Sequence, residues 1–288
     1  MNRTTLPESK KVFKSLKYNI IVMLVVTIIF NNKLFSQENT TYSNLDNYYK
    51  WGIVVGSSVY DKAKIEKTFG DYTFTNRNPL SYNIGLEYDF YPSKKWSFVT
   101  GLWITKEPLY NIKYRIFQKD LYPHFTEDLV DYSMGYGIPT FSFPLLLRYN
   151  LKASQNIYFN FFSGLKAMYF PPGTSYYGVE ISKEDFSDVR EIFGLKMESQ
   201  DFSFYGSFVI GAGASFARKK VLLKARAIYV MNFQNTINGE YQFGNMFSSP
   251  PARGTYELSG NYIGILLTAN LKKSKNPLFV FKSHSKKE

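Results

Sequence analysis

The sequence predicts an all-β protein, an eight-stranded antiparallel up-and-down transmembrane β-barrel with four long extracellular loops and three short periplasmic turns. Three observations predict it: apolar and polar residues alternate with period two, long and short connections alternate strictly, and aromatic residues gather at segment ends. Successive side chains point to opposite faces of a strand. Outer-membrane barrels combine an apolar outer face with short periplasmic turns and long external loops.

The hairpin Leu80–Thr105 shows the alternation most clearly. Every second residue from Leu80 to Phe90 is apolar, polar or small residues lie between them, and an apolar face resumes after a turn at 92–94. In a soluble sandwich this face would pack on a second sheet, whereas in a barrel it would meet lipid. The other connections decide between these two architectures.

Six further segments have the length of roughly 9–11 residues that a transmembrane strand needs. Long connections follow the first, third, fifth and seventh strands, so all long loops share one end and both termini lie at the other. In the last segment, Ile263 and Ile265 are out of phase with Tyr256 and Leu258, which predicts a β-bulge near 260–264. The six segments are Lys50–Tyr60, Thr140–Leu151, Ile157–Phe170, Phe202–Phe216, Val221–Phe233 and Tyr256–Leu271.

Composition agrees with this fold. The chain holds 26 Phe and 24 Tyr, and membrane interfaces enrich aromatic side chains. The aromatics predicted near the turns are Phe90, Trp96, Tyr149 and Phe159, and those near the loops are Phe141, Tyr169, Phe202, Tyr229 and Phe233. The chain has no cysteine, which excludes disulfides and thiolate metal sites, and we expect no metal and no cofactor.

The net charge of +12 does not indicate nucleic acid. Residues 1–36 carry six basic residues and one acidic residue, and residues 272–288 carry the same numbers, so each end contributes +5 and the remainder only +2. A nucleic-acid-binding domain would gather its basic residues on one face of the folded body. We therefore expect no nucleic-acid partner.

The N-terminus has the pattern of a secretory signal peptide. Lysines at 10, 11, 14 and 17 precede a 12-residue apolar run, Asn19–Phe30, which is short for a bilayer span. We assign residues 1–36 to a signal peptide, 37–49 to a flexible periplasmic lead-in, 50–272 to the barrel and 273–288 to a basic periplasmic tail. An uncleaved N-terminal anchor is the alternative.

Phe143–Tyr149, FPLLLRY, resembles the "IPLLLKY" strand of the Bacteroidota outer-membrane β-barrel family that includes PorT-like proteins. The Phe35-Ser36-Gln37 sequence is also typical of that phylum. The resemblance implies an outer-membrane location and a lumen too narrow for a general pore, and it implies no reaction. Pro144 has no N–H to donate, so we expect it at a bulge or an unpaired position of the ladder.

Six charged residues are predicted to point into the barrel, with Lys166 nearer to the loops than the other five: Glu87, Asp89, Arg148, Lys166, Lys224 and Arg226. Side chains fill the interior of an eight-stranded barrel, and buried charges must be paired or hydrogen-bonded. We expect a paired charge network in a filled lumen, with room for it provided by inward Gly85, Gly101, Gly164 and Gly211. An ion or proton path is the alternative.

The long loops are predicted to carry specificity. Exposed aromatic residues in the second loop suit contact with protein, glycan or lipopolysaccharide, and our interaction candidates are Tyr110, Tyr114, Phe117, Tyr122, His124 and Tyr132. The alternative is that the loops pack on one another and cover the barrel. In the third loop, Ser182–Phe193 is predicted to form a short helix with Ser182 as its N-cap.

We therefore expect a non-enzymatic, monomeric outer-membrane barrel that is exported and acts through its loops or within an envelope complex, which could be secretion-related. One alternative is a narrow, porin-like channel for small solutes or ions. Another is a lipid-modifying or proteolytic enzyme at the rim, since His124 lies near Glu127, Asp128 and Asp131 and a His–acid pair can act as a general base. No nucleophile accompanies it, so we assign no catalytic residue. The expected partners are outer-membrane lipid, lipopolysaccharide and envelope proteins.

Overall fold

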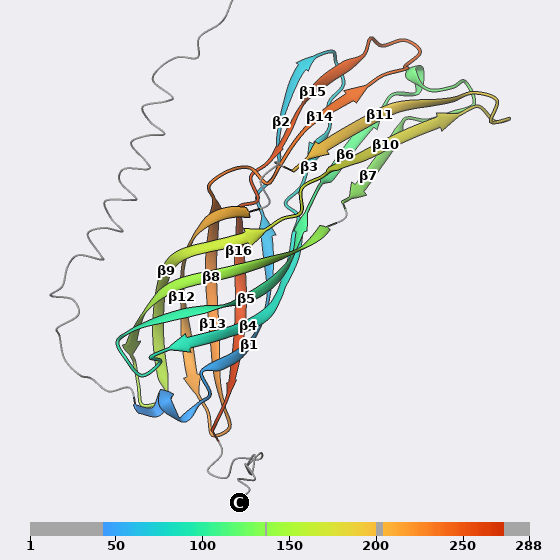
Figure 1. The fold of residues 1–288 in the computed structure, drawn as a ribbon. Helices are drawn as coiled ribbons and strands as arrows, with labels where there is room; N and C mark the ends of the chain where they lie inside the picture. The colour runs from blue at the N-terminus through green and yellow to red at the C-terminus, as the bar shows by residue number, and fades with distance from the viewer. Residues whose placement is uncertain (1–42, 136, 200–203, 274–288) are drawn as a thin grey trace, which may run out of the picture. The chain divides into compact units, whose positions relative to one another are not determined.

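Eight strands close into an antiparallel barrel in the computed structural model, which describes residues 43–135, 137–199 and 204–273 (Figure 1). The order around the barrel is β1-β16-β13-β12-β9-β8-β5-β4, and β4 pairs with β1 to complete the cylinder. This confirms the predicted fold class. The barrel strands are β1 (Trp51–Tyr60), β4 (Leu80–Phe90), β5 (Trp96–Pro108), β8 (Gly137–Lys152), β9 (Ile157–Tyr169), β12 (Phe204–Ala217), β13 (Val221–Asn232) and β16 (Tyr262–Leu271).

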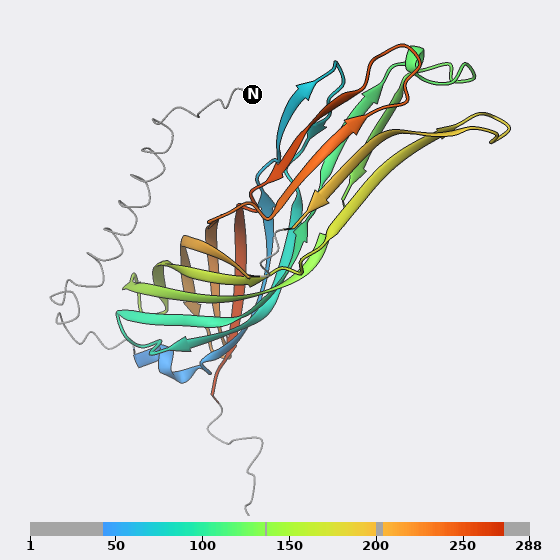
Figure 2. The ribbon, with the colours of Figure 1, turned by 45° about the horizontal axis from the view of Figure 1, so that its top comes forward.

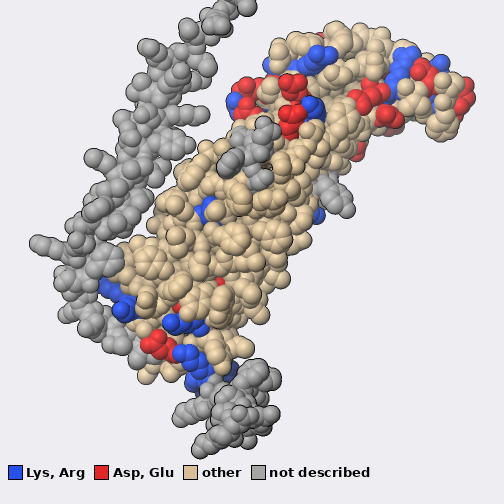
Figure 3. Space-filling view, viewed as in Figure 1, with Lys and Arg blue, Asp and Glu red and all other residues tan. Residues whose placement is uncertain are grey.

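The outer surface of the barrel is apolar. Outward side chains such as Ile53, Leu145 and Ile265 are 60%, 59% and 63% exposed. On the face drawn in Figure 3, a largely uncharged band covers the barrel between two regions that are richer in charge. An apolar surface of this extent is far larger than a soluble monomer exposes. The outer face therefore has the composition of a surface that meets lipid.

The long loops fold into two further sheets beyond the barrel, which we call the head (Figure 2). One sheet has five strands in the order β10-β11-β14-β15-β2, and the other has three in the order β3-β6-β7. The elements of the head are β2 (Lys64–Phe69), β3 (Thr75–Asn76), β6 (Asn111–Ile116), the 3₁₀ helix η3 (Gln118–Asp120), β7 (Leu129–Met134), β10 (Thr174–Ser182), β11 (Val189–Glu198), β14 (Ile237–Phe243) and β15 (Ala252–Leu258).

The head has an aromatic core of its own. Phe74 lies 4.9 Å from Tyr241 between ring centroids, and Phe193 lies 4.7 Å from Phe243 and 5.0 Å from Tyr114. Of the three clusters of buried apolar residues in the described part of the chain, the one in the head is the largest, with 23 residues against 11 in the barrel. The loops therefore pack on one another, as one of the two alternatives predicted.

Two predictions about the loops are wrong. The expected helix at Ser182–Phe193 is instead a hairpin, because β10 ends at Ser182, a turn follows, and β11 begins at Val189. β10 and β11 pair with each other along this hairpin, and this pairing outweighs the weak helix-capping signal at Ser182. The expected last strand, Tyr256–Leu271, is two strands, β15 in the head and β16 in the barrel. They are separated at Gly260, whose φ of 70° breaks the ladder, so the change of phase marks a strand boundary and not a bulge.

Pro144 lies where the pairing of β8 with β5 is interrupted. The ladder joins Thr100 to Leu145 and resumes at Trp103 and Ser142, and it skips the residues between them. The hydroxyl of Thr100 donates a 2.9 Å hydrogen bond to the Pro144 carbonyl. This agrees with the unpaired position expected of a proline in a sheet.

The inward glycines serve close strand packing more than space for charged side chains. A Cβ atom at Gly85 would collide with the carbonyl oxygen of Leu102, and one at Gly101 would collide with that of Leu86. The neighbouring backbone, and not a long side chain, occupies the space beside each glycine. Gly164 behaves in the same way, whereas beside Gly211 the ring of Phe162 also enters the space, so room for a side chain is found there and not at the other three glycines.

The described part of the expected flexible lead-in is ordered against the barrel. Ser43–Asn47 forms the 3₁₀ helix η2, and Tyr48 bridges to Lys272 at the end of β16. Leu45 and Tyr48 are buried with Tyr158 and Leu222 at the end of the barrel that carries the short turns, here called the turn end. This apolar contact explains why residues 43–48 are ordered against the barrel. The signal-peptide assignment and most of the basic tail, from residue 274 onward, lie outside the described residues.

Among the described residues, no helix is long and apolar enough to cross a membrane.

Candidate functional site

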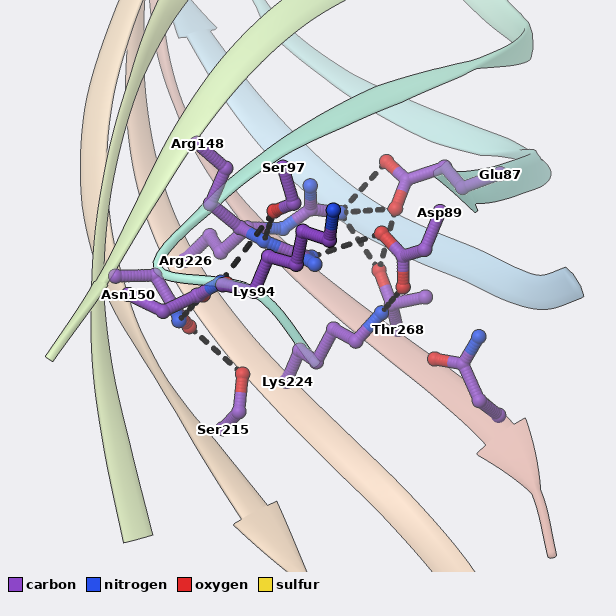
Figure 4. Close-up of polar contacts among 12 residues, drawn as sticks. Glu87, Asp89, Lys94, Ser97, Arg148, Asn150, Ser215, Lys224, Arg226 and Thr268 are labelled. Atoms are coloured by element: carbon purple, nitrogen blue, oxygen red, sulfur yellow. Dashed lines mark hydrogen bonds and ion pairs between the residues drawn. The ribbon is translucent and has the colours of Figure 1, made fainter. Parts of the chain in front are cut away.

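Five of the six predicted lumen charges form one buried network (Figure 4). Asp89 on β4 accepts a 2.8 Å hydrogen bond from Arg148 on β8 and another from Lys224 on β13. Two residues earlier on β4, Glu87 accepts bonds of 2.6 and 2.7 Å from Arg226. Residues two apart on a strand share a face, so β4 directs both carboxylates toward cations on strands distant in sequence.

Neutral groups bind further polar atoms of the network, although the Nε of Arg226 is buried without a hydrogen-bond partner. Trp103 donates to Glu87 over 3.1 Å, Thr268 donates to the same carboxylate over 3.2 Å, and the Arg148 Nε donates to Ser97 over 2.9 Å. The network holds two carboxylates and three cations, so it carries one excess positive charge. Buried ion pairs of this kind are costly to break, because removing one partner leaves the other charge in the interior.

Lys166 lies apart from this network, as its position along β9 predicted. Its Nζ is 4.9 Å from the ring centroid of Tyr262 and 3.5 Å from the hydroxyl of that residue. Tyr60, whose ring lies 4.8 Å from that of Tyr262, donates a 2.8 Å hydrogen bond to buried Glu107. Glu107 lies two residues beyond Thr105, the predicted end of this strand, although the alternation of inward-facing residues continues through Glu107.

Further layers of side chains lie along the lumen. Phe162, Leu146 and Leu266 belong to a buried apolar cluster in the barrel. Toward the turn end, Asn160 donates to Asn150 over 2.7 Å and accepts from Ser215 over 2.7 Å. Tyr48, which follows η2, donates a 2.6 Å hydrogen bond to the Arg218 carbonyl in the last turn. A hydrated ion entering the lumen would therefore meet a charged layer, an apolar layer and a hydrogen-bonded layer in its path.

The structure separates the six loop candidates into core and surface residues. Tyr114 and Tyr122 are each 2% exposed and belong to the core of the head, whereas Tyr110 is half-buried. Phe117 and Tyr132 are 46% and 39% exposed. An interaction role for these residues stays a prediction, and the accessible part of the set is smaller than the sequence implied.

His124 is not joined to its neighbouring acids in a catalytic arrangement. Its ring stacks on Tyr122 and packs against Phe125, at centroid distances of 6.0 and 4.5 Å. Asp128 binds Arg115 and the backbone N–H of Gln118, and these hydrogen bonds hold the pKa of Asp128 below its ordinary value. Two of the three carboxylates that the sequence placed near His124 are therefore engaged elsewhere, since Asp131 also accepts hydrogen bonds, from the hydroxyls of Tyr114 and Tyr177.

Asp120 ties three loops of the head together, and the sequence analysis did not single it out. Its buried carboxylate accepts hydrogen bonds from Tyr72 in the first loop (2.6 Å) and from Ser249 in the fourth (2.9 Å). The backbone N–H groups of Ser248 and Ser249 also donate to it, over 3.0 and 2.7 Å. Burial raises the pKa of Asp120, but these hydrogen bonds outweigh it and leave the pKa below its ordinary value.

No family model and no curated protein match this chain, so the resemblance of Phe143–Tyr149 to one family stays a prediction. Among solved structures, the outer membrane protein OprG of Pseudomonas aeruginosa is 12% identical, over 79% of this chain and 98% of that one, with a TM-score of 0.36. The toluene transporter TodX of P. putida is 7% identical, over 83% and 94%, with a TM-score of 0.28. The transport unit of the autotransporter AIDA-I from Escherichia coli is 11% identical, over 86% and 96%, with a TM-score of 0.21.

Proposed function

We propose that this protein is a non-conducting bacterial outer-membrane barrel that carries a folded external head, through which it contacts a partner at the cell surface. The head core supports this most directly, because four connections that only closed a barrel would not need to supply 21 of the 23 buried apolar residues in this cluster, the other two being Met168 on β9 and Tyr205 on β12. Binding residues are commonly held on loops that a rigid scaffold positions. Here the loops themselves are built as sheets.

The apolar exterior supports the membrane location. Strands of 10 to 16 residues form the barrel, which meets the length that a bilayer requires. The Phe143–Tyr149 motif supports placing the chain with the Bacteroidota outer-membrane barrels. Because the long loops of such barrels are extracellular, the head would lie outside the cell and the η2 segment in the periplasm.

The tip of the β10–β11 hairpin is the best candidate contact within the head. Phe186 is 76% exposed and has a φ of 56°, a left-handed conformation that costs a non-glycine residue about 1–3 kcal/mol. The Asp185 carboxylate fixes this turn by accepting hydrogen bonds from the Ser187 N–H and hydroxyl. An exposed, pre-positioned aromatic side chain is the kind of residue that anchors interfaces.

A photo-reactive side chain at position 186 tests the contact in living cells. It should form a defined cross-link, whereas the same group at exposed Lys196 on the face of the five-stranded sheet should form none. Equal labelling at both positions, or none at either, would contradict a role for the hairpin tip.

Recordings in planar bilayers test the closed lumen. The charged network, the apolar layer and the N-terminal segment lead us to expect no steady openings from the folded protein. Sustained, reproducible conductance steps would instead support the narrow-channel alternative.

A further inference from the structure

β10 is an open edge of the head. It is the end strand of the five-stranded sheet, where its neighbour is β11, and the β10–β11 hairpin stands at one side of the head (Figure 2). Within the part of the chain that the structure describes, no backbone hydrogen bond joins Thr174–Ser182 to an element other than β11. An edge strand of this kind presents a row of unpaired N–H and C=O groups, which can pair with another chain.

The two edges of this sheet differ in their protection. β2, at the opposite edge, has six residues, of which Lys64, Glu66 and Lys67 are charged. β10 has nine residues, and Glu180 is the one charged residue among them. Proteins protect edge strands against pairing by keeping them short and charged. The register shift in the hairpin does not interrupt β10, because the extra residue, Ile192, belongs to β11. β10 is therefore the edge that is suited to accept a further strand.

A pocket of about 370 Å³ lies beside the second half of β10, and its lining residues come from both β10 and β7. Phe125, Leu129 and Val179 line it with apolar surface and pack against the core of the head. Side chains alternate across a strand, so a strand added to β10 would direct every second side chain toward the core side of the sheet, next to this surface. The pocket is suited to an apolar side chain of such a strand.

The rim of the pocket is acidic. Glu180 and Glu184 are exposed, and within the described structure no hydrogen bond or ion pair engages either carboxylate. Asp131 adds a third carboxylate to the lining, and Lys183, whose Nζ lies 3.9 Å from the Asp188 carboxylate, is the lysine among the described lining residues. Three acidic residues against one lysine favour a cationic partner, because interfaces match opposite charges.

We propose that β10 binds an extended polypeptide segment of the surface partner, in which apolar and basic side chains alternate. The segment pairs with the open edge of β10 as a sixth strand of the sheet. Its apolar side chains lie against the pocket, and its basic side chains lie beside Glu180 and Glu184. In this mode of recognition, backbone hydrogen bonds give affinity and pockets for alternate side chains give specificity. The inference rests on the proposed function, since it specifies what the head contacts.

The test uses the folded protein in phosphatidylcholine nanodiscs and the fluorescence anisotropy of a labelled octapeptide of alternating valine and lysine. This peptide should bind, and a valine–glutamate peptide of the same length should bind more weakly. Empty nanodiscs measure the attachment of each peptide to lipid. The change of electrophoretic mobility on heating checks that the protein and each variant are folded.

N-methylation of the peptide separates strand pairing from charge attraction. Alternate residues of a strand form their hydrogen bonds at opposite edges, so the valine N–H groups share one edge and the lysine N–H groups share the other. Methylation of either set keeps every side chain and every charge. One methylated peptide should bind like the unmodified one, and the other should bind at least about tenfold more weakly, because several backbone hydrogen bonds are lost.

A charge reversal in the protein tests the acidic rim. The Glu180→Lys/Glu184→Lys variant should bind the valine–glutamate peptide about fivefold more tightly than the valine–lysine peptide, since each exposed ion pair contributes roughly a two- to threefold factor. The matched control, Glu66→Lys/Glu240→Lys, makes the same change at exposed positions on β2 and β14. This control should keep the preference of the unaltered protein.

Equal binding of the two methylated peptides would overturn the strand-pairing proposal. Absence of binding by the valine–lysine peptide would also overturn it, as would an unchanged preference in the charge-reversal variant. Dimers that native mass spectrometry detects and that the peptide dissociates would assign the edge to a second copy of this chain instead. These results leave the proposed function standing, because the cross-link at position 186 and the absence of conductance test it separately.

Discussion

Replacing Asp89 by Asn is expected to destabilise the barrel strongly. Asp89 is 2% exposed and is bound by both Arg148 and Lys224. Asparagine has nearly the same shape and retains one oxygen acceptor, so the substitution removes the charge while leaving the packing almost unchanged. The network would then hold one carboxylate against three cations.

The magnitude follows from the geometry. At 2.8 Å, the Asp89–Arg148 pair has a Coulomb attraction of about 6 kcal/mol for an effective dielectric constant of about 20. Desolvation of the two ions offsets part of this attraction. Breaking a buried pair by removing one partner costs about 3–5 kcal/mol, because the remaining cations stay buried without compensation.

Urea unfolding in lipid vesicles, followed by tryptophan fluorescence, measures this loss. Asp61→Asn makes the same chemical change at an exposed site and should alter the free energy of unfolding by less than about 0.5 kcal/mol. Adding Lys224→Met to Asp89→Asn should recover part of the loss, since it removes one uncompensated cation. A loss below about 1 kcal/mol for Asp89→Asn would refute the assignment of a paired, buried network.

Two other substitutions test the barrel wall and the head. Gly85→Ala should lower the free energy of unfolding by more than about 3 kcal/mol or prevent folding, because its Cβ would collide with the Leu102 carbonyl. Gly173→Ala is the control, since a Cβ there would have no atom within 4 Å, and it should be neutral in the same urea assay. The pKa of Asp120 is lower in the folded head than in the unfolded chain, so its carboxylate contributes stability that is fully present above about pH 4 and is lost as the pH falls through the folded value. Asp120→Asn should therefore destabilise the head at neutral pH and remove this acid-dependent loss of stability. The near-ultraviolet circular dichroism of the head tyrosines follows the transition. An acid transition that is the same in the variant and in the unaltered protein would contradict the role of Asp120.

The barrel could be predicted because each strand carries its own signal. Side chains alternate along a strand with a period of two, which determines those that face lipid. This alternation alone assigns Glu87, Asp89 and Arg148 to the lumen. The height of Lys166 followed from counting residues along β9. Which cation binds which carboxylate could not be predicted, since these pairs depend on the register between strands that are far apart in sequence.

The head could not be predicted in the same way. Its strands are short, and in β2 the charged Lys67 lies between Ile65 and Phe69 on the same face, so alternation is weak there. The exposed aromatic residues expected in the second loop include Tyr114, which is instead core, because the sequence does not show that Phe193 of the third loop stacks on it. Glu107 was missed for a simpler reason, since the strand continues two residues past the expected end.

Single-cysteine labelling tests the central claim most directly, and the chain has no cysteine of its own. In intact cells, a membrane-impermeant maleimide should label a cysteine at Tyr176 in the head. It should not label one at Leu86 or Ile265 on the barrel exterior, and it should label one at Lys219 in the last turn only after the outer membrane is opened. Labelling of the barrel positions in intact cells as readily as the head position would contradict a barrel embedded in lipid with its head outside.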